Sequence, residues 1–356
     1  MGKFVAFCKK KGVVPSWKTY FIDAMSAMAL GLFASLLMST ILDTIGDFVF
    51  QNQTDDFLHT IAGYASGASG MAIGCAVAGA LKAPPLVLAS CAVGGSIGDS
   101  LPTVFTIAGA DKSLTAGPAG AFFAVLVACE LGKLVCKSTK VDILVTPTVT
   151  LFAGFGVSAL LCPGIAYGMY YLGQFINYAT EMQPILMGII IAVVVGIILT
   201  LPISSAAICA MIGITGIAGG AAAAGCCAQM VGFAVISYRE NKIGGLVAQG
   251  LGTSMLQMGN ICRNPLIWIP PTLASAITGP LATTVFKLKC TGVSAGMGTC
   301  GLVGPIGVFS DSGSSAMTVI GVVLVCFVLP AALSLLFSEI MRKLGWIKPG
   351  DMKLDV

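Results

Sequence analysis

Long apolar runs separated by short polar corners make up most of the chain. The first clear run covers residues 20–42, and the most apolar one covers residues 184–201. Lipid leaves a spanning chain only helices or closed barrels, and continuous rather than alternating runs favour helices. The pattern therefore predicts an all-α polytopic membrane protein. The other runs cover residues 66–81, 84–105, 117–135, 143–161, 206–217, 218–236, 245–261, 266–286, 296–309 and 317–337.

Several of these runs are shorter than the roughly 20 residues that a crossing helix needs. The runs 206–217, 245–261 and 296–309 are also rich in glycine or interrupted by proline. Short, broken apolar segments are typical of half-helices and re-entrant hairpins that line a substrate path. We therefore expect about ten transmembrane helices plus re-entrant hairpins.

A weak internal similarity accompanies this pattern. Shifting the chain by 124 residues aligns residues 120–148 with residues 244–272. Both segments read as a glycine-rich helix, a polar corner and a helix broken by Pro-Thr, which indicates possible inverted repeats.

Charge placement orients the chain in the bilayer. Basic clusters near the N-terminus, at 133–140, 239–242, 287–289 and 342–348 predict cytoplasmic positions, whereas the acidic segment 43–56 is expected outside. Both termini are then cytoplasmic, in a bacterial cytoplasmic membrane. The expected domains are a cytoplasmic amphipathic segment over residues 1–19, an integral membrane permease domain over residues 20–340, and a cytoplasmic C-terminal tail over residues 341–356. We expect no cleaved signal peptide.

Composition excludes most other classes of protein. Charged residues are 10% of the chain, against roughly 25% in an average soluble protein. That excludes an ordinary soluble enzyme, a disordered chain and a nucleic-acid binder, which needs clustered Lys and Arg. The thirteen cysteines are scattered without a Cys-x-x-Cys pair, and there is one histidine. We therefore expect no metal, no cofactor and no catalytic centre on this chain.

Two carboxylates lie inside or beside apolar runs, where an ionised group is costly and indicates function. Asp99 follows Gly94-Gly95-Ser96-Ile97-Gly98 and precedes Pro102, so a solute contact competes with a role as a helix cap. Glu130 lies three residues before Lys133 near the end of an apolar run. A solute contact there competes with a plain helical ion pair.

The segment 257–265, Gln-Met-Gly-Asn-Ile-Cys-Arg-Asn-Pro, is the richest in polar groups between two apolar runs. Its side chains offer both donors and acceptors, as a hydroxyl-rich or anionic solute needs. Asp311, after the glycine-rich run 296–309, is a further candidate or a helix cap. The predicted substrate-binding residues are Asp99, Glu130, Gln257, Asn260, Arg263, Asn264 and Asp311.

These segments carry a resemblance to a known family. The stretch 264–273, Asn-Pro-Leu-Ile-Trp-Ile-Pro-Pro-Thr-Leu, resembles the Asn-Pro…Ile-Pro-Phe stretch of membrane permease subunits (enzyme IIC) of the bacterial sugar phosphotransferase system. On segments 141–147, 237–241, 250–254 and 296–301, the chain looks more like the compact branch that includes perfringolysin-regulator-type proteins. The likeness covers residues 21–337.

The resemblance implies a ten-span permease, commonly a homodimer, that moves a sugar by alternating access past a midplane site. A separate cytoplasmic IIB subunit would phosphorylate the sugar. Permeases of the wider superfamily place a His and a Glu in the core, whereas this chain has no core His, and Glu130 is the only mid-chain Glu near an apolar helix.

Three functions are therefore open from the sequence. The first is a permease for a small polar solute, a sugar above all. The second is a membrane-embedded regulator or sensor that keeps the permease fold. The third is an ion-coupled carrier without phosphotransfer, in which Glu130 and Asp99 bind a proton or Na⁺.

Overall fold

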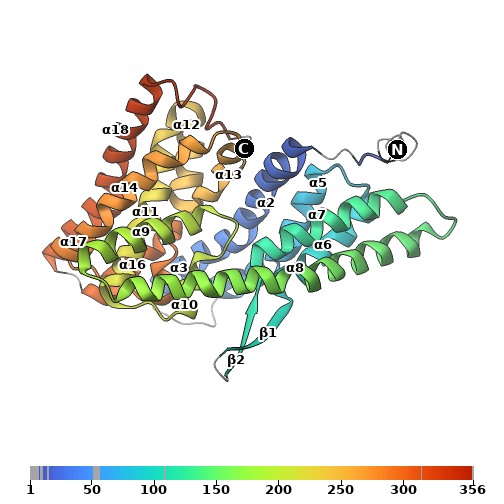
Figure 1. The fold of residues 1–356 in the computed structure, drawn as a ribbon, viewed down its shortest axis with the longest axis horizontal. Helices are drawn as coiled ribbons and strands as arrows, with labels where there is room; N and C mark the ends of the chain where they lie inside the picture. The colour runs from blue at the N-terminus through green and yellow to red at the C-terminus, as the bar shows by residue number, and fades with distance from the viewer. Residues whose placement is uncertain are drawn as a thin grey trace. The chain divides into compact units, whose positions relative to one another are not determined.

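The computed structural model describes residues 8, 11–13, 16–50, 57–107, 110–313 and 315–354. The described chain is almost entirely helical and divides into two units (Figure 1). Unit 1 contains Met1–Leu36 and Gly63–Gly168, and unit 2 contains Leu37–Ala62 and Met169–Val356. The expected all-α class is confirmed, and most of the predicted segment 1–19 lies outside the described residues.

Unit 1 is built from helices that pack through glycine. A Cβ on Gly98 would lie 2.5 Å from the carbonyl oxygen of Gly120, and a Cβ on Gly120 would meet the carbonyl oxygen of Gly98. Glycine at both positions therefore lets helices α6 and α7 touch backbone to backbone. The helices at least partly in this unit are η1 (Lys18–Asp23), α2 (Ala24–Leu32), η2 (Phe33–Leu37), α4 (Phe57–Gly67), α5 (Ser69–Ala80), α6 (Pro85–Ser100), α7 (Gly117–Val135) and α8 (Asp142–Thr180).

A small hairpin follows α6 in unit 1. Strand β1 (Pro102–Ile107) pairs antiparallel with β2 (Ala110–Thr115), with Pro102 opposite Thr115. The apolar run 84–105 was expected to contain a helix break near its glycines and Pro102, and the helix ends at Ser100. Leu101 precedes a proline and has an extended backbone (φ −61°, ψ 113°), because the proline ring disfavours a helical conformation at the residue before it.

Unit 2 is organised around α11 (Gly216–Ile236). This helix packs against α9 (Pro184–Thr200), α14 (Ile269–Pro280) and α18 (Leu329–Lys343), and α14 also packs against both α9 and α18 (Figure 1). Gly and Ala make up most of the first half of α11, and 89% of its most apolar 18-residue stretch is buried. A helix buried on all sides is expected to be apolar all round, and Gln229 is the exception among the buried residues of α11.

The remaining elements of unit 2 are mostly short. The segment after α11 is broken into five pieces before α14 begins, which agrees with the expected break in the run 245–261. These elements are α3 (Met38–Phe50), α10 (Ser205–Met211), α12 (Tyr238–Val247), η3 (Ala248–Gly252), η4 (Ser254–Gln257), α13 (Met258–Arg263), η5 (Pro265–Trp268), η6 (Leu281–Val285), α15 (Gly292–Ala295), η7 (Cys300–Leu302), α16 (Val303–Ser312), α17 (Ala316–Val322) and η8 (Val323–Val328).

Among the described residues, five helical stretches are long and apolar enough to cross a membrane. A sixth is possible if α4 and α5, bent by 51°, form one broken span. The ten crossings expected from the sequence are not confirmed, because several apolar runs fold as short or interrupted helices. The five stretches are Lys18–Asp43, Gly117–Val135, Asp142–Thr180, Gly216–Ile236 and Ala316–Lys343.

The two segments of the possible repeat differ in local structure. Residues 120–135 lie in the single helix α7, whereas residues 244–259 are divided among α12, η3, η4 and α13. The inverted repeat stays a prediction.

Candidate solute site

The candidate site is built on the broken segment between α11 and α14. Thr253 has an extended backbone, and its hydroxyl accepts a hydrogen bond from the amide of Met255, which starts η4. Asn264 is also extended, as the residue before Pro265 should be. Its side-chain oxygen accepts from the amide of Leu266 and so caps η5. These breaks turn a run of polar side chains toward one region of unit 2.

Three carboxamides of this segment form a buried chain of hydrogen bonds. Gln249, Gln257 and Asn260 are 0%, 0% and 6% exposed. The Nε2 of Gln257 donates to Oε1 of Gln249 over 2.9 Å, and the Nδ2 of Asn260 donates to Oε1 of Gln257 over 2.8 Å. Gln249 in turn donates to Oγ of Ser237 over 2.8 Å. The side chains of Gln249, Gln257, Asn260, Asn241 and Asn264 are called the carboxamide cluster below.

The cluster holds residues 346–354, called the strap below. The Nε2 of Gln257 and the Nδ2 of Asn241 both donate to the carbonyl of Met352, over 3.0 and 2.8 Å. Asn260 donates to the carbonyl of Lys353 over 2.9 Å, and the amide of Leu354 donates to Oδ1 of Asn241 over 2.8 Å. Three carboxamide side chains therefore form hydrogen bonds with main-chain groups of the consecutive residues 352–354.

Two further side chains, Glu240 and Asn264, also form hydrogen bonds with the strap. The amide of Met352 donates to Oε2 of Glu240 over 2.8 Å, and the other carboxylate oxygen of Glu240 pairs with Arg342 at 3.4 Å. The Nδ2 of Asn264 donates to the carbonyl of Trp346 and to Oδ2 of Asp351, over 3.0 and 2.8 Å.

The strap turns back on itself and buries two apolar side chains. The amide of Lys348 donates to Oδ2 of Asp351 over 2.8 Å, and Gly350 has a φ of +97°, which glycine adopts without strain. Ile347 and Met352 are 2% and 0% exposed. They join an apolar cluster with Phe233, Ile236, Ile261, Ile267 and Met341.

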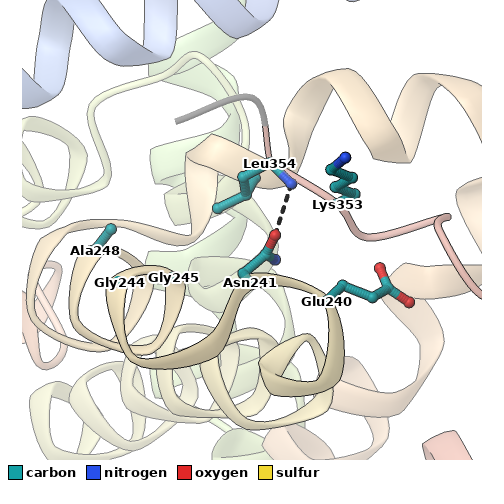
Figure 2. Close-up of a pocket in the computed structure, with 7 residues that line it drawn as sticks. All are labelled: Glu240, Asn241, Gly244, Gly245, Ala248, Lys353 and Leu354. Atoms are coloured by element: carbon teal, nitrogen blue, oxygen red, sulfur yellow. Dashed lines mark hydrogen bonds between the residues drawn. The ribbon is translucent and has the colours of Figure 1, made fainter.

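A cavity lies where the strap meets α12. Its volume is about 450 Å³, within the usual range for small-molecule sites. Glu240, Asn241, Gly244, Gly245 and Ala248 form one side, and Lys353 and Leu354 of the strap form the other. Figure 2 shows the amide of Leu354 bonded to Asn241 at this wall, with no side chain on the two glycines. A carboxylate and a carboxamide beside glycine backbone suit a hydroxyl-rich ligand.

The structure brings three predicted site residues together: Gln257, Asn260 and Asn264. Arg263 belongs to the same segment but is exposed. Asp311 is exposed on α16, where its neighbour Ser312 accepts from the amide of Lys289 over 2.7 Å.

Asp99 and Glu130 both lie in unit 1, and each has a partner there. Ser69 donates its hydroxyl to Oδ2 of Asp99 over 2.8 Å, which ties α5 to α6. Oε1 of Glu130 pairs with Lys133 at 2.8 Å, and its Oε2 is buried without a hydrogen-bond partner.

Lys133 is 3% exposed and uses all three of its ammonium protons. Besides Glu130, its Nζ donates to the carbonyls of Gly12 and Leu81, over 3.1 and 3.2 Å. The Glu130–Lys133 pair therefore joins α7 to two other segments of unit 1.

Sequence reasoning missed Glu240, Asn241, Gln249 and the strap as parts of this site. Asn241 and Gln249 lie on the side of the broken segment toward α11, in a stretch that reads as a basic corner. The strap carries one local signal, the Lys-Pro-Gly-Asp sequence over 348–351, which predicts a turn between Ile347 and Met352.

Comparison with known proteins gives one finding about the whole chain. A family model described as "Phosphotransferase system, EIIC" matches residues 22–354, which include the carboxamide cluster and the strap. Searches of curated proteins and of solved structures found no match.

Proposed function

Because the chain belongs to the EIIC family of the phosphotransferase system, we propose that it carries a small hydroxyl-rich solute through a site at the carboxamide cluster. The family consists of sugar-specific membrane permease components that work with a cytoplasmic IIB subunit. The chain is accordingly an integral membrane component of sugar transport.

The observation that carries the choice of site is the cavity of about 450 Å³ beside Glu240 and Asn241. Sugar hydroxyls both donate and accept hydrogen bonds, and a neighbouring carboxylate and carboxamide supply both partners. Gln257 and Asn260 extend the same set of donors under the strap. As direct solute contacts, Asp99, Glu130, Gln257, Asn260, Arg263, Asn264 and Asp311 stay predictions.

Transport by alternating access is the proposed mechanism, in a homodimer with both termini cytoplasmic. Because residues 239–242 and 341–356 are expected on the cytoplasmic side, the carboxamide cluster would form the cytoplasmic end of the solute path, and the midplane site stays a prediction. The predicted domain division, with residues 20–340 as the permease domain, is retained in this proposal. The short broken helices of unit 2 support the mechanism, since such segments line solute paths in transporters.

An uptake screen tests the proposal. The purified protein in proteoliposomes, with and without a IIB subunit, is offered sugars, sugar alcohols and small organic anions. We expect one sugar or sugar alcohol to accumulate. The Asn241→Ala variant should lower its binding about tenfold, or ~1.4 kcal/mol, as loss of one or two hydrogen bonds would. The matched control is Asn177→Ala, which removes an exposed carboxamide at the end of α8.

Three other outcomes would redirect the proposal. No accumulation of any solute, together with a cytoplasmic partner captured by crosslinking, would favour a membrane-embedded regulator. Uptake that survives loss of phosphotransfer but collapses with the ion gradient would identify an ion-coupled carrier. Equal binding by the Asn241 and Asn177 variants would remove the carboxamide cluster from the site.

A further inference from the structure

The strap occupies the hydrogen-bonding groups that a solute would need. Apart from the amide of Lys353, which donates to the carbonyl of Gly350 over 3.3 Å, the polar contacts described for residues 352–354 come from side chains of the proposed site. Asn241, Gln257 and Asn260 give N–H donors to the carbonyls of Met352 and Lys353. Glu240 and Asn241 accept from the amides of Met352 and Leu354.

This pattern of contacts is the one that a sugar would use. A peptide carbonyl and a hydroxyl oxygen both accept from a carboxamide N–H, and a peptide N–H and a hydroxyl both donate to a carboxylate or amide oxygen. Residues 352–354 thus present an alternating set of donors and acceptors in place of hydroxyl groups. A sugar bound at this site would need the same groups of Asn241, Gln257 and Asn260 that now bind the strap.

The strap also limits the size of the cavity. Lys353 and Leu354 form its wall opposite α12, as Figure 2 shows. If these residues move away, the cavity opens toward Gln257 and Asn260, which the strap now covers.

The strap has two separate attachments, so its later part can leave while the earlier part stays. Trp346 and Asp351 are held by Asn264, and Ile347 is buried in the apolar cluster. Residues 352–354 are held by one buried side chain, Met352, and by the hydrogen bonds described above. The two attachments meet between Asp351, which Asn264 holds, and Met352, whose amide donates to Glu240.

We propose that residues 352–354 are a tethered competitor for the solute site, and that solute binds fully only when they have left it. This proposal rests on the proposed function, because it needs the carboxamide cluster to bind solute. The apparent affinity for solute is then lowered by the fraction of molecules in which the strap is closed.

The test compares the full chain with two variants that open the strap. One ends at Asp351, through a stop codon in place of Met352. The other is Leu354→Pro, which removes the N–H that donates to Asn241 and keeps the Met352 side chain. The control is Leu344→Ala, an exposed residue before the strap that is 59% exposed. Thermal unfolding checks that all four proteins fold.

Two quantities are measured with D-glucose, D-mannitol and D-maltose at millimolar concentration. The first is equilibrium binding by each protein. The second is hydrogen exchange of the Met352 and Leu354 amides in the full chain. We expect both strap variants to bind at least one of these compounds about tenfold more tightly than the full chain and the control. The same compound should speed exchange of both amides.

The outcomes separate the two proposals. If a compound binds equally to all four proteins and leaves amide exchange unchanged, the competing strap is wrong and the sugar site stands. If no protein binds any of the three compounds, the sugar site fails, and the strap as its competitor fails with it.

Discussion

At the scale of single residues, two buried polar side chains, Lys133 and Gln257, are bound to specific main-chain and side-chain groups. Lys133 binds two carbonyls and one carboxylate, and Gln257 binds one carbonyl and two carboxamides. Such groups are costly to bury without partners, because no hydrogen bond then compensates for the loss of hydration of the amide or ammonium group. The hydrogen-bond partners of a buried polar residue therefore determine whether it stabilises the fold or is available to bind a ligand.

The Glu130–Lys133 pair gives a residue-scale prediction. Lys133→Met should lower the free energy of unfolding by about 3–5 kcal/mol, because it leaves a buried carboxylate without its partner. Thermal and denaturant unfolding in detergent would measure the loss. Lys137→Met, at an exposed position, is the control. Adding Glu130→Gln to Lys133→Met should restore part of the stability. A double variant as unstable as the single one would contradict the ion-pair explanation.

At the scale of elements, close helix packing in unit 1 depends on glycine at the contact between α6 and α7. Gly120 faces the carbonyl of Gly98, whereas Gly156 on α8 has no atom within 4 Å of the place where its Cβ would lie. These two helical glycines therefore differ in what a methyl group would meet: Gly120 is buried against α6, and Gly156 is exposed.

We predict opposite effects of alanine at these two positions. Gly120→Ala should destabilise unit 1 by about 1–3 kcal/mol, because the added methyl group forces α6 and α7 apart. Gly156→Ala should be neutral or stabilise by up to ~1 kcal/mol, because it removes only the conformational freedom of the unfolded chain. The unfolding midpoints of the two variants would measure this difference. A Gly120→Ala protein as stable as the Gly156→Ala protein would mean that α6 and α7 can separate without cost.

The sequence predicts helices well where an apolar run is uninterrupted. The run 117–135 and helix Gly117–Val135 have the same bounds. The sequence predicts the ends of helices less well. Helix α6 ends at Ser100, inside the apolar run 84–105, and helix Asp142–Thr180 extends well beyond the apolar run 143–161. The polar segment 257–265 was predicted to bind solute, but its contact with the strap was not predicted. Gln257 and Met352 are 95 residues apart, and neither helical periodicity nor local turn signals report contacts at that separation.

At the scale of the whole molecule, the basic clusters predict which ends of the helices face the cytoplasm. Tags at the N-terminus and after residue 356 should both resist protease added outside intact cells, and both should be cut once the membrane is opened. A protease site inserted in the acidic segment 43–56 should be cut from outside. Cleavage of only one terminal tag in intact cells would mean an odd number of crossings and would contradict the predicted orientation.

The long separation between the carboxamide cluster and the strap has a consequence for biosynthesis. A ribosome adds about 5–20 residues per second, so about 5–20 s pass between the synthesis of Gln257 and that of Met352, 95 residues later. During that interval Gln257, Asn260 and Asn264 emerge without the main-chain groups that they bind in the finished protein. A nascent chain stalled before residue 346 would therefore present this polar segment, without its main-chain partners, to the insertion machinery. The segment would form its final hydrogen bonds only after residues 346–354 had been synthesised.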